Sequence, residues 1–445
     1  MSDATDQMAN ETTETLIIGA GLAGLSFALH HPGEALIVEA TDHVGGKAMS
    51  ERFDDYTFDV TGHWLHLRDA GMKALIFRLL GEDHFHRIER ISRIWSHGVY
   101  TQYPFQSNVF GLPPAVVHAC VMGAIEADRR KGDVRDAADE PENFADWIRF
   151  FFGEGIAEHF MVPYNAKLWG VSAGKITSRW CQRFVPKPKL DDIVAGAVGL
   201  NASGVGYNAS FLYPKHGGIQ TLSDALADEV GRDRIRLNTR VTGIDLDRRV
   251  AFIGDRTIAF KHLINTAPLP DFLKGINGLP AEMAAARGRL RATETPYLNV
   301  GIEGPLGQPD HWIYVPERAW PMYRVGSFSN AVPAMAPPGH SSLYVELADR
   351  ATPAEALVPR VIEGLVAMGL IDDPRRVRFV HPRRIPHAYV VYDFAWHDTT
   401  AAIHAWLASQ RVQSIGRYGE WKYSSMEDAM IDGREAAARL AGGSP

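Results

Sequence analysis

Three glycines near the start of the chain have a spacing that suits a phosphate-bearing ligand. Gly19, Gly21 and Gly24 make a GxGxxG pattern in the run GAGLAG. In this pattern the first glycine allows a tight turn, the second lets the backbone approach a pyrophosphate, and the third lets a helix pack closely on a strand. The start of that helix adds partial positive charge. The pattern also arises by chance as a flexible turn, so its surroundings decide between the two interpretations.

Those surroundings favour a dinucleotide site. The apolar run TLII directly precedes the glycines, LAGLSFALHH has the apolar spacing of a helix, and ALIVEA indicates a second buried strand with Glu39 at its end. A strand, a glycine turn, a helix and a strand form a βαβ unit, which implies a parallel sheet. An acid at the end of the second strand accepts hydrogen bonds from a ribose. We therefore expect the three glycines and Glu39 to hold a dinucleotide.

A second pair of glycines follows the acid almost at once. Gly45, Gly46 and Lys47 stand in the run EATDHVGGKA. A flexible double glycine with a cation behind it suits a further contact to a pyrophosphate; otherwise the run is a surface turn with a solvated lysine. Nicotinamide-binding domains do not need this element, whereas the amine-oxidase class of FAD enzymes carries it, and this run resembles theirs. The resemblance makes FAD the expected cofactor.

Two later runs resemble the same class of FAD enzyme. YPKHGGIQTLSDALA resembles a glycine-containing segment that lies near the flavin, and GRYGEWKYSSMEDAMIDGREAA resembles the C-terminal flavin-binding signature. The resemblance implies that Gly416 and Arg417 end a strand at the cofactor. It also implies that a helix beginning around Met426 points its backbone N–H groups at the flavin, and it assigns Val241 to the cofactor site.

Within this class the chain is most similar to the UDP-galactopyranose mutase family, in order along nearly its whole length. The segments that carry the resemblance are TGHWLH (61–66), YPFQSNVFGLP (103–113), PYNAKLWGVSAGKI (163–176), PMYRVGSF (321–328) and GRYGEWKY (416–423). Protoporphyrinogen oxidases and other amine-oxidase relatives share the FAD elements but match the middle segments less well. The chain is therefore identified as a member of this FAD-dependent superfamily that resembles the mutases.

The mutase resemblance implies a reaction in which the flavin is a nucleophile. In that family N5 of reduced FAD attacks the anomeric carbon of a sugar nucleotide and expels UDP, and the sugar ring opens and recloses as a furanose. The protein supplies cations for the diphosphate and aromatic side chains for the nucleotide. The resemblance implies Arg324, Arg417 and His63 as catalytic residues, and Tyr164, Trp169, Arg324, Tyr389 and Tyr423 as substrate contacts.

Several of these residues also have a structural interpretation. Tyr164 and Trp169 fit a hydrophobic core, and a single arginine is most often a surface or ion-paired residue. His66 is as good a candidate as His63 for the place beside the flavin.

One position departs from the mutase pattern. In the mutases an arginine follows the Trp-Gly pair and contacts substrate, whereas this chain has Val171 there. Either another cation compensates, with Lys167 and Lys175 as candidates, or the substrate differs. Other sugar nucleotides and carrier-linked sugars therefore stay open.

The expected fold class is α/β, α+β overall, with a Rossmann-like FAD-binding domain, a helical insertion and an antiparallel-sheet substrate domain. The predicted boundaries are 14–75, 205–275 and 405–442 for the discontinuous FAD-binding domain, 76–204 for the mainly helical domain, 276–404 for the mixed-sheet substrate domain, and 1–13 for a disordered tail.

Composition limits the possible partners. The net charge of −7 over 445 residues argues against a broad nucleic-acid surface. The two cysteines, Cys120 and Cys181, lack metal or disulfide spacing, so no metal site is expected. The absence of a bilayer-length apolar run predicts no membrane span and a cytoplasmic protein. The expected partners are a small-molecule substrate of the nucleotide-sugar type and a reductant, either NAD(P)H or a redox partner.

Three functions remain open at this point. The first is a reduced-flavin pyranose-furanose mutase acting on a sugar nucleotide. The second is an amine-oxidase-type oxidoreductase that takes a hydride from a small molecule, which the shared FAD signatures support equally because fold does not settle function. The third is a flavin-binding protein without catalysis.

Overall fold

The computed structural model describes residues 10–131, 140–183, 185–200 and 209–442. Of the tail predicted over 1–13, residues 1–9 lie outside the described residues. Residues 11–13 differ from that prediction, because strand β1 (Glu11–Ile18) already begins at Glu11. Glu11 pairs in register with Ile258 of β12 (Arg256–Asn265), so the strand is held in a sheet from its first residue.

A parallel sheet is the centre of the unit that contains the glycine-rich turn. The strands run in the order β10-β11-β12-β1-β2-β9, and β18 also pairs with β12. Strands β9, β2, β1, β12 and β18 are parallel, and β11 and β10 continue the sheet antiparallel. The further bounds are β2 (Ala35–Val38), β9 (Ile235–Arg236), β10 (Gly243–Asp245), β11 (Val250–Ile253) and β18 (Val412–Ser414).

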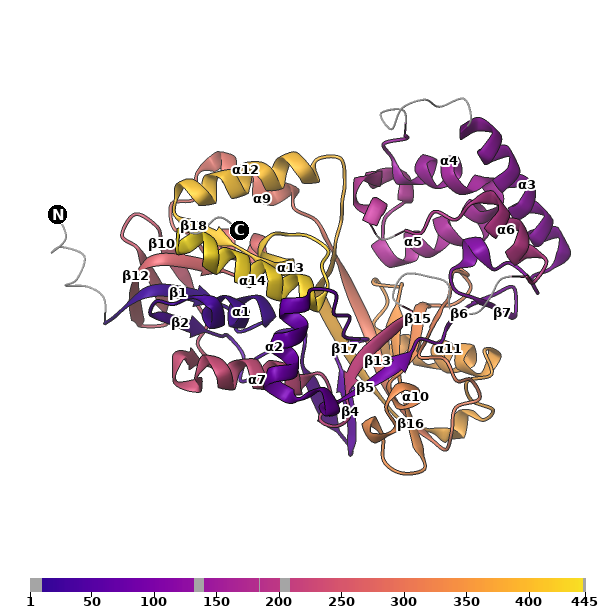
Figure 1. The fold of residues 1–445 in the computed structure, drawn as a ribbon, viewed down its shortest axis with the longest axis horizontal. Coiled ribbons are helices and arrows are strands. Elements are labelled where there is room, and N and C mark those ends of the chain that lie inside the picture. The colour runs from indigo at the N-terminus through magenta and orange to yellow at the C-terminus, as the bar shows by residue number, and fades with distance from the viewer. Residues whose placement is uncertain (1–9, 132–139, 184, 201–208, 443–445) are drawn as a thin grey trace.

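Helices cover both faces of this sheet (Figure 1). Ile17 of β1 packs into a core with α1, α2, α7 and α14, whereas its neighbour Leu16 packs into a second core with α8, α9 and α12. The bounds are α1 (Leu22–His30), α2 (Ala70–Leu80), α7 (Gln220–Val230), α14 (Met426–Leu440), α8 (Leu269–Lys274), α9 (Ala281–Arg289) and α12 (Trp396–Ser409). The predicted Rossmann-like fold is confirmed. Helix α9 and most of α12 lie inside 276–404, yet they pack on this sheet and not in the substrate domain predicted there.

A second, mostly antiparallel sheet lies mainly within 276–404, the region predicted as the substrate domain. Its order is β17-β13-β16-β15-β14-β6-β7. The bounds are β6 (Ser92–Ser96), β7 (Val99–Gln102), β13 (Ala292–Glu303), β14 (Trp312–Tyr314), β15 (Met322–Ser327), β16 (His340–Leu347) and β17 (Val377–Val390), and α10 (Phe328–Ala331) and α11 (Ala354–Ala367) pack against it. Strands β6 and β7 fall within 76–204, which was predicted to be mainly helical. They join this sheet because β6 pairs in parallel with β14.

Two short pairs of strands connect the larger units. Strands β3 (Ser50–Phe53) and β4 (Tyr56–Asp59) form a hairpin, and β5 (Phe85–Glu89) pairs with β8 (Ser210–Pro214). The hairpin leads from the second glycine pair toward His63, and β8 leads into the turn before α7. These segments therefore carry the chain between the predicted cofactor elements.

The helical insertion forms one end of the molecule (Figure 1). Its helices are α3 (Pro114–Lys131), α4 (Phe144–Ile156), α5 (Val162–Trp169) and α6 (Leu190–Ala197). Helices α3 and α4 approach backbone to backbone, since a Cβ at Gly153 would lie 2.0 Å from the Gly123 carbonyl oxygen. A five-residue π-helix over Ala157–Met161 joins α4 to α5. None of the described helices is both long and apolar enough to cross a membrane.

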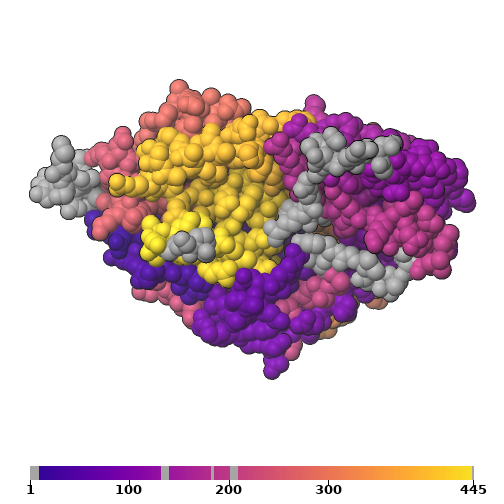
Figure 2. Space-filling view, turned by 45° about the horizontal axis from the view of Figure 1, so that its top comes forward, coloured from indigo at the N-terminus to yellow at the C-terminus, as the bar shows by residue number. Residues whose placement is uncertain are grey.

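The two ends of the described chain meet in one unit. In the space-filling view the yellow C-terminal residues lie against the indigo and purple N-terminal ones (Figure 2). Ser26 of α1 donates a hydrogen bond of 2.6 Å to the Met430 carbonyl of α14.

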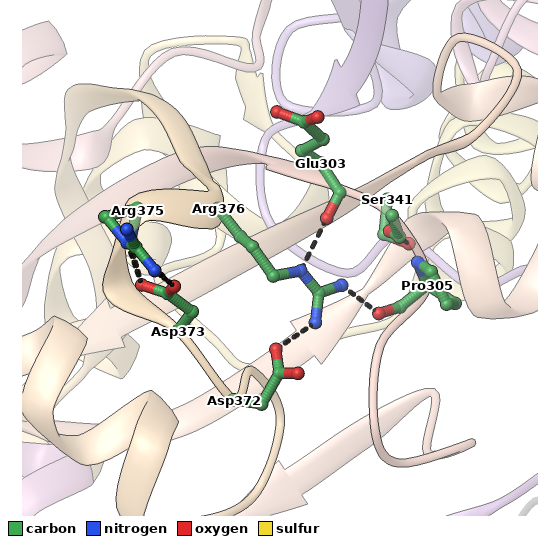
Figure 3. A network of polar contacts seen from close by, with 8 residues as sticks. Glu303, Pro305, Ser341, Asp372, Asp373, Arg375 and Arg376 are labelled. Carbon is green, nitrogen blue, oxygen red and sulfur yellow. Dashed lines mark hydrogen bonds and ion pairs between the residues drawn. The ribbon is translucent and has the colours of Figure 1, made fainter.

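Arg376 joins the end of β13 to the start of β17 in the second sheet. Its guanidinium binds the Glu303 and Pro305 carbonyls and the Asp372 side chain (Figure 3).

The contact between α1 and α14 requires a glycine, which gives a first prediction. A Cβ at Gly433 would lie 2.4 Å from the Ala23 carbonyl oxygen and 2.7 Å from the Phe27 nitrogen. Gly433→Ala should therefore lower the free energy of unfolding by roughly 1–3 kcal/mol. Gly288→Ala is the matched control, because its Cβ would meet no atom within 4 Å. Denaturant unfolding measures both, and equal stability of the two variants would contradict the close approach.

Candidate functional site

The glycine-rich turn is built as a close approach of backbone to backbone. Gly19 has a φ of 105°, and a Cβ there would lie 2.3 Å from the Thr266 hydroxyl oxygen. A Cβ at Gly24 would lie 2.1 Å from the Gly19 carbonyl oxygen. Both positions therefore require glycine, for conformation at the first and for helix packing at the second. The turn brings the start of α1 to the carboxyl end of β1.

The second glycine pair lies against this turn. Gly45 forms a bridge with Gly21, and the Gly45 amide donates to the Ala20 carbonyl at 2.8 Å. A Cβ at Gly46 would lie 3.4 Å from the Gly21 Cα. Gly21 is the N-cap of α1, and a glycine has no side chain with which to cap that helix end. Its first N–H groups can therefore bind phosphate oxygens, which fits the pyrophosphate of a dinucleotide.

Glu39 is held in place by three donors. One carboxylate oxygen accepts from the Ala20 amide at 2.9 Å, and the other accepts from the Thr41 amide and hydroxyl, each at 2.9 Å. A carboxylate has four lone-pair sites, so capacity for a ribose remains. The Thr239 amide donates to the Glu39 carbonyl at 2.7 Å. This hydrogen bond holds the segment that contains Val241 next to Glu39. These contacts place the predicted cofactor residues of the two segments together.

Of the two histidines, His63 lies with the predicted cofactor residues Lys47 and Arg417. Burial, together with the charges of Arg417 and Lys47, lowers the pKa of His63 to about 4. Burial also lowers the pKa of Lys47, which Glu39 partly offsets. The neighbours of His66 are different, namely the Ser210 carbonyl and the ring of Phe211. His63 is therefore a neutral imidazole at the predicted flavin position.

The C-terminal signature folds against the start of α1. Gly416 has a φ of 76°, and a Cβ there would lie 2.6 Å from the Ala23 Cβ. Arg417 donates to the Ser424 carbonyl at 2.9 Å and to the Ala388 carbonyl at 2.6 Å. Helix α14 then begins at Met426, behind a capping box made by Ser425. Arg417 thus links the C-terminal signature to β17.

Arg324 and Arg417 converge on one tyrosine although they come from distant parts of the chain. Arg324 donates to Glu346 at 2.5 Å and to the Tyr389 hydroxyl at 3.2 Å. The Tyr389 ring stacks on Tyr423 with centroids 6.1 Å apart, and the Arg417 guanidinium lies 5.6 Å and 4.8 Å from the two ring centroids. Burial raises the pKa of Tyr389 to about 12, although Arg324 lowers it. Cations and aromatic rings therefore meet in one region.

The aromatic residues predicted from the helical insertion differ in their surroundings. The Tyr164 ring stacks on Phe160 at 5.3 Å and meets Tyr314 edge-on at 5.3 Å. Trp169 is 2% exposed, and its indole N–H donates to the Asn165 side chain at 3.2 Å. Trp169 is therefore a core residue. Its ring packs edge-on against the Tyr389 ring, with the centroids 5.6 Å apart.

Neither candidate lysine replaces the arginine that is absent at Val171. The Lys167 ammonium donates to the Val315, Glu317 and Met322 carbonyls at 3.0, 2.7 and 2.5 Å. Lys167 therefore connects α5 to the residues around β14 and β15. Lys175, the other candidate, is exposed at the surface. Val171 itself packs at the edge of the helical core.

Glu346 is a site residue that sequence reasoning missed. Its side chain is 1% exposed and pairs with Arg324 from the neighbouring strand β15. The available signal was a single acid inside the apolar run LYVEL. A charged residue in a buried strand needs a partner, so this pattern predicts an ion pair but not the identity of its cation.

This geometry combines the predicted dinucleotide-binding turn with a neighbouring cluster of cations and tyrosines, and comparison with known proteins assigns the class of protein. Residues 22–441 match the family model for flavin containing amine oxidoreductases. The chain belongs to that family, which implies FAD as its cofactor.

The chain is also similar to several solved structures of flavoenzymes, and the degree of similarity differs between them. A crystal structure of reduced UDP-galactopyranose mutase is 25% identical, with a TM-score of 0.90 over 97% of this chain and 94% of that one. A putative protoporphyrinogen oxidase from Exiguobacterium is 16% identical, with a TM-score of 0.69 over 97% and 99% of the two chains. Putrescine oxidase bound to putrescine is 17% identical, with a TM-score of 0.67 over the same shares. The last two likenesses show the fold alone.

Curated relatives match over a short segment only. Protein anon-37Cs of Drosophila lebanonensis is 36% identical over 100 residues, which are 22% of this chain and 18% of that protein. The Drosophila melanogaster protein of the same name is 35% identical over 78 residues, 17% of this chain and 15% of that protein. The matches thus span less than a fifth of the length of these relatives.

The buried pair of Arg324 and Glu346 gives a second prediction. Removing one partner of a buried ion pair leaves an uncompensated charge, so Arg324→Met should lower the free energy of unfolding by about 3 kcal/mol. The double variant Arg324→Met, Glu346→Gln should recover much of that loss, because no charge is left buried. Denaturant unfolding of both single variants and the double variant gives the coupling. Additive losses would contradict the direct pairing.

Proposed function

We propose that this chain is an FAD enzyme that interconverts the pyranose and furanose forms of a sugar nucleotide, with the flavin in its reduced state. The observation that carries the proposal is the convergence of Arg324 and Arg417 on Tyr389, beside the cofactor cradle. Two cations in a partly buried pocket suit a diphosphate. The likeness to reduced UDP-galactopyranose mutase over almost the whole chain supports it.

The proposed roles follow from the contacts. When bound, reduced flavin supplies a nucleophilic nitrogen that can displace a diphosphate from an anomeric carbon. Arg324 keeps one nitrogen on Glu346, and its Nε is buried without a hydrogen-bond partner among the described residues. The side chain as a whole is 21% exposed, and we assign its remaining N–H groups to a phosphate oxygen. Arg417 is held by two carbonyls and adds a fixed positive charge, which stabilises the departing diphosphate.

His63 has a different role in this proposal. Its pKa of about 4 keeps the imidazole neutral at neutral pH, because burial and the neighbouring cations disfavour the charged form. A neutral imidazole can donate from one ring nitrogen and accept at the other. We assign His63 to hydrogen bonding with the flavin and not to acid catalysis.

The alternative function is hydride transfer from a small molecule to oxidised FAD. The match to the flavin containing amine oxidoreductases favours this reaction class. The same cradle serves both reactions, and Val171 leaves the nucleotide end of the pocket less cationic than an arginine would.

For the mutase reaction, we assign the substrate to the class of nucleotide sugars. We assign the reductant to NAD(P)H or a redox partner, and the place of action to the cytoplasm.

Turnover under controlled redox conditions gives a third prediction. The purified protein is reduced with dithionite without oxygen and offered a panel of nucleotide hexoses. We expect furanose formation by the reduced enzyme, with no net change in flavin absorbance, and no furanose formation by the oxidised enzyme. The oxidised enzyme in the same panel is the control. Bleaching of oxidised flavin by a substrate, with recovery in oxygen, would instead establish the oxidoreductase.

Binding of UDP gives a fourth prediction. Each charge-assisted hydrogen bond is worth about 1.5–3 kcal/mol, so Arg324→Ala and Arg417→Ala should each weaken UDP binding roughly 10- to 100-fold. Arg360→Ala is the control, because Arg360 is an exposed residue of α11 that pairs with Glu363. Calorimetric titration of folded, FAD-loaded protein measures the affinities. Unchanged UDP affinity in both site variants would remove the diphosphate assignment.

A further inference from the structure

Asp59 is a buried carboxyl at the end of β4 that none of the proposed steps uses. The residue is 1% exposed. It accepts hydrogen bonds from the Ser50 hydroxyl at 2.6 Å, the Tyr213 hydroxyl at 2.6 Å and the Ile219 amide at 3.3 Å. These donors belong to β3, to β8 and to the residue before α7. Asp59 therefore joins three segments that are far apart in the sequence.

No cation pairs with Asp59 among the described residues. The groups that face it are Ser50, Tyr213, the Ile219 amide and, from β13, Tyr297. Burial raises the pKa of Asp59 to about 7, although its three hydrogen bonds lower it. A buried carboxyl without a cation is costly, and a neutral amide would avoid that cost. Packing alone therefore does not explain why an aspartate stands at this position.

The first reason lies at the start of α7. The Gln220 amide donates to the Ser50 hydroxyl at 3.1 Å, and Ser50 in turn donates to Asp59. Ile219, the N-cap residue, makes no side-chain cap. A Cβ at Gly218 would lie 2.2 Å from the Ser50 hydroxyl oxygen and 3.1 Å from Asp59. Asp59 and Ser50 therefore cap α7 from outside the helix.

Helix α7 holds the second glycine pair. The Ser223 hydroxyl donates to the Ala48 carbonyl at 2.6 Å, and the Gln220 side chain donates to the Val44 carbonyl at 3.2 Å. A Cβ at Gly45 would lie 2.6 Å from the Ser223 hydroxyl oxygen. The segment from Val44 to Ala48 is thus fixed to the first turn of α7, and Gly45 in turn contacts Gly21.

On its other side Asp59 leads directly to His63. Thr61, between them, has a φ of 61°, which is rare for a β-branched residue. The space at Gly62 is also closed, because a Cβ there would lie 2.5 Å from the Tyr344 hydroxyl oxygen. Such a conformation persists only where its neighbours fix it. Asp59 is the anchor at the start of this segment.

We propose that Asp59 is a positioning residue for the flavin, which holds the glycine pair and the His63 segment in register through Ser50, Tyr213 and the start of α7. The inference rests on the proposed flavin site. Asp59 does not touch the cofactor and acts through the segments that it joins.

The titration of Asp59 gives a pH signature with a definite sign. The folded-state pKa of about 7 lies above the ordinary value of 3.8, so the folded protein binds an additional proton between these values. Stability from this group is fully present below pH 3.8 and is lost as the pH rises toward 7. Asn at this position removes that loss.

The fifth prediction tests this role through FAD release from the holoenzyme. Dilution series followed by free-flavin fluorescence give the dissociation constant. Losing the three hydrogen bonds should raise it about tenfold or more in Asp59→Ala, whereas Asp59→Asn should stay within about threefold of wild type. Asp59→Asn should also remove the fall in stability between pH 4 and 7. The visible circular dichroism of bound FAD should change in Asp59→Ala and return in Asp59→Asn.

Matched variants keep the test decisive if Asp59→Ala fails to fold. Tyr213→Phe removes one donor to Asp59 and should weaken FAD retention, whereas Tyr100→Phe removes the hydroxyl of a half-buried tyrosine, bound to the Met368 carbonyl, and should not. Equal FAD retention in wild type, Asp59→Ala and Tyr213→Phe overturns the positioning role. A wild-type protein that retains no FAD overturns the flavin site itself, and the role of Asp59 with it.

Discussion

Close approach of backbone segments around the start of α1 is the constraint on which the rest of the structure depends. Gly24 packs on Gly19, Gly45 bridges to Gly21, and both Gly416 and Gly433 meet Ala23. At Gly24, Gly416 and Gly433 the contact leaves no room for a side chain. Because these glycines come from both ends of the chain, the start of α1 is fully enclosed only when the C-terminal segment packs against it. The discontinuous organisation of the fold follows from that requirement.

The neighbouring cluster of cations and tyrosines depends on the second sheet in a similar way. Arg324 and Glu346 stand on adjacent strands, and Tyr389 comes from β17 on the far side of β13. The C-terminal signature then adds Arg417 and Tyr423. A buried carboxylate holds one cation and backbone carbonyls hold the other, so neither guanidinium needs a surface partner. The cluster of cations and tyrosines is therefore held in place by the second sheet and the C-terminal segment together.

Local pattern was enough to predict the strand, glycine turn, helix and strand at the start of the chain, because these elements lie in one short run. The turn at Gly19, the position of Glu39 and the fold class all follow from alternation of apolar residues and glycine spacing. Residues whose role depends on partners far away in the sequence were harder to predict. Glu346 could be recognised as needing a cation but not matched to Arg324, and Trp169 could not be told from a pocket residue before its indole partner Asn165 was seen. Strands β6 and β7 were assigned to the helical region because their pairing with β14 is long-range.

The bonds of Lys167 also determine how the parts of this molecule can move. Its ammonium group holds three carbonyls around β14 and β15, and Arg350 binds the carbonyls of Lys167 and Leu168 at the end of α5 at 2.9 Å each. Separating α5 from the second sheet would require all of these hydrogen bonds to break. Tyr164 of α5 and Arg324 of β15 are therefore held at a fixed spacing by bonds that neither residue makes itself.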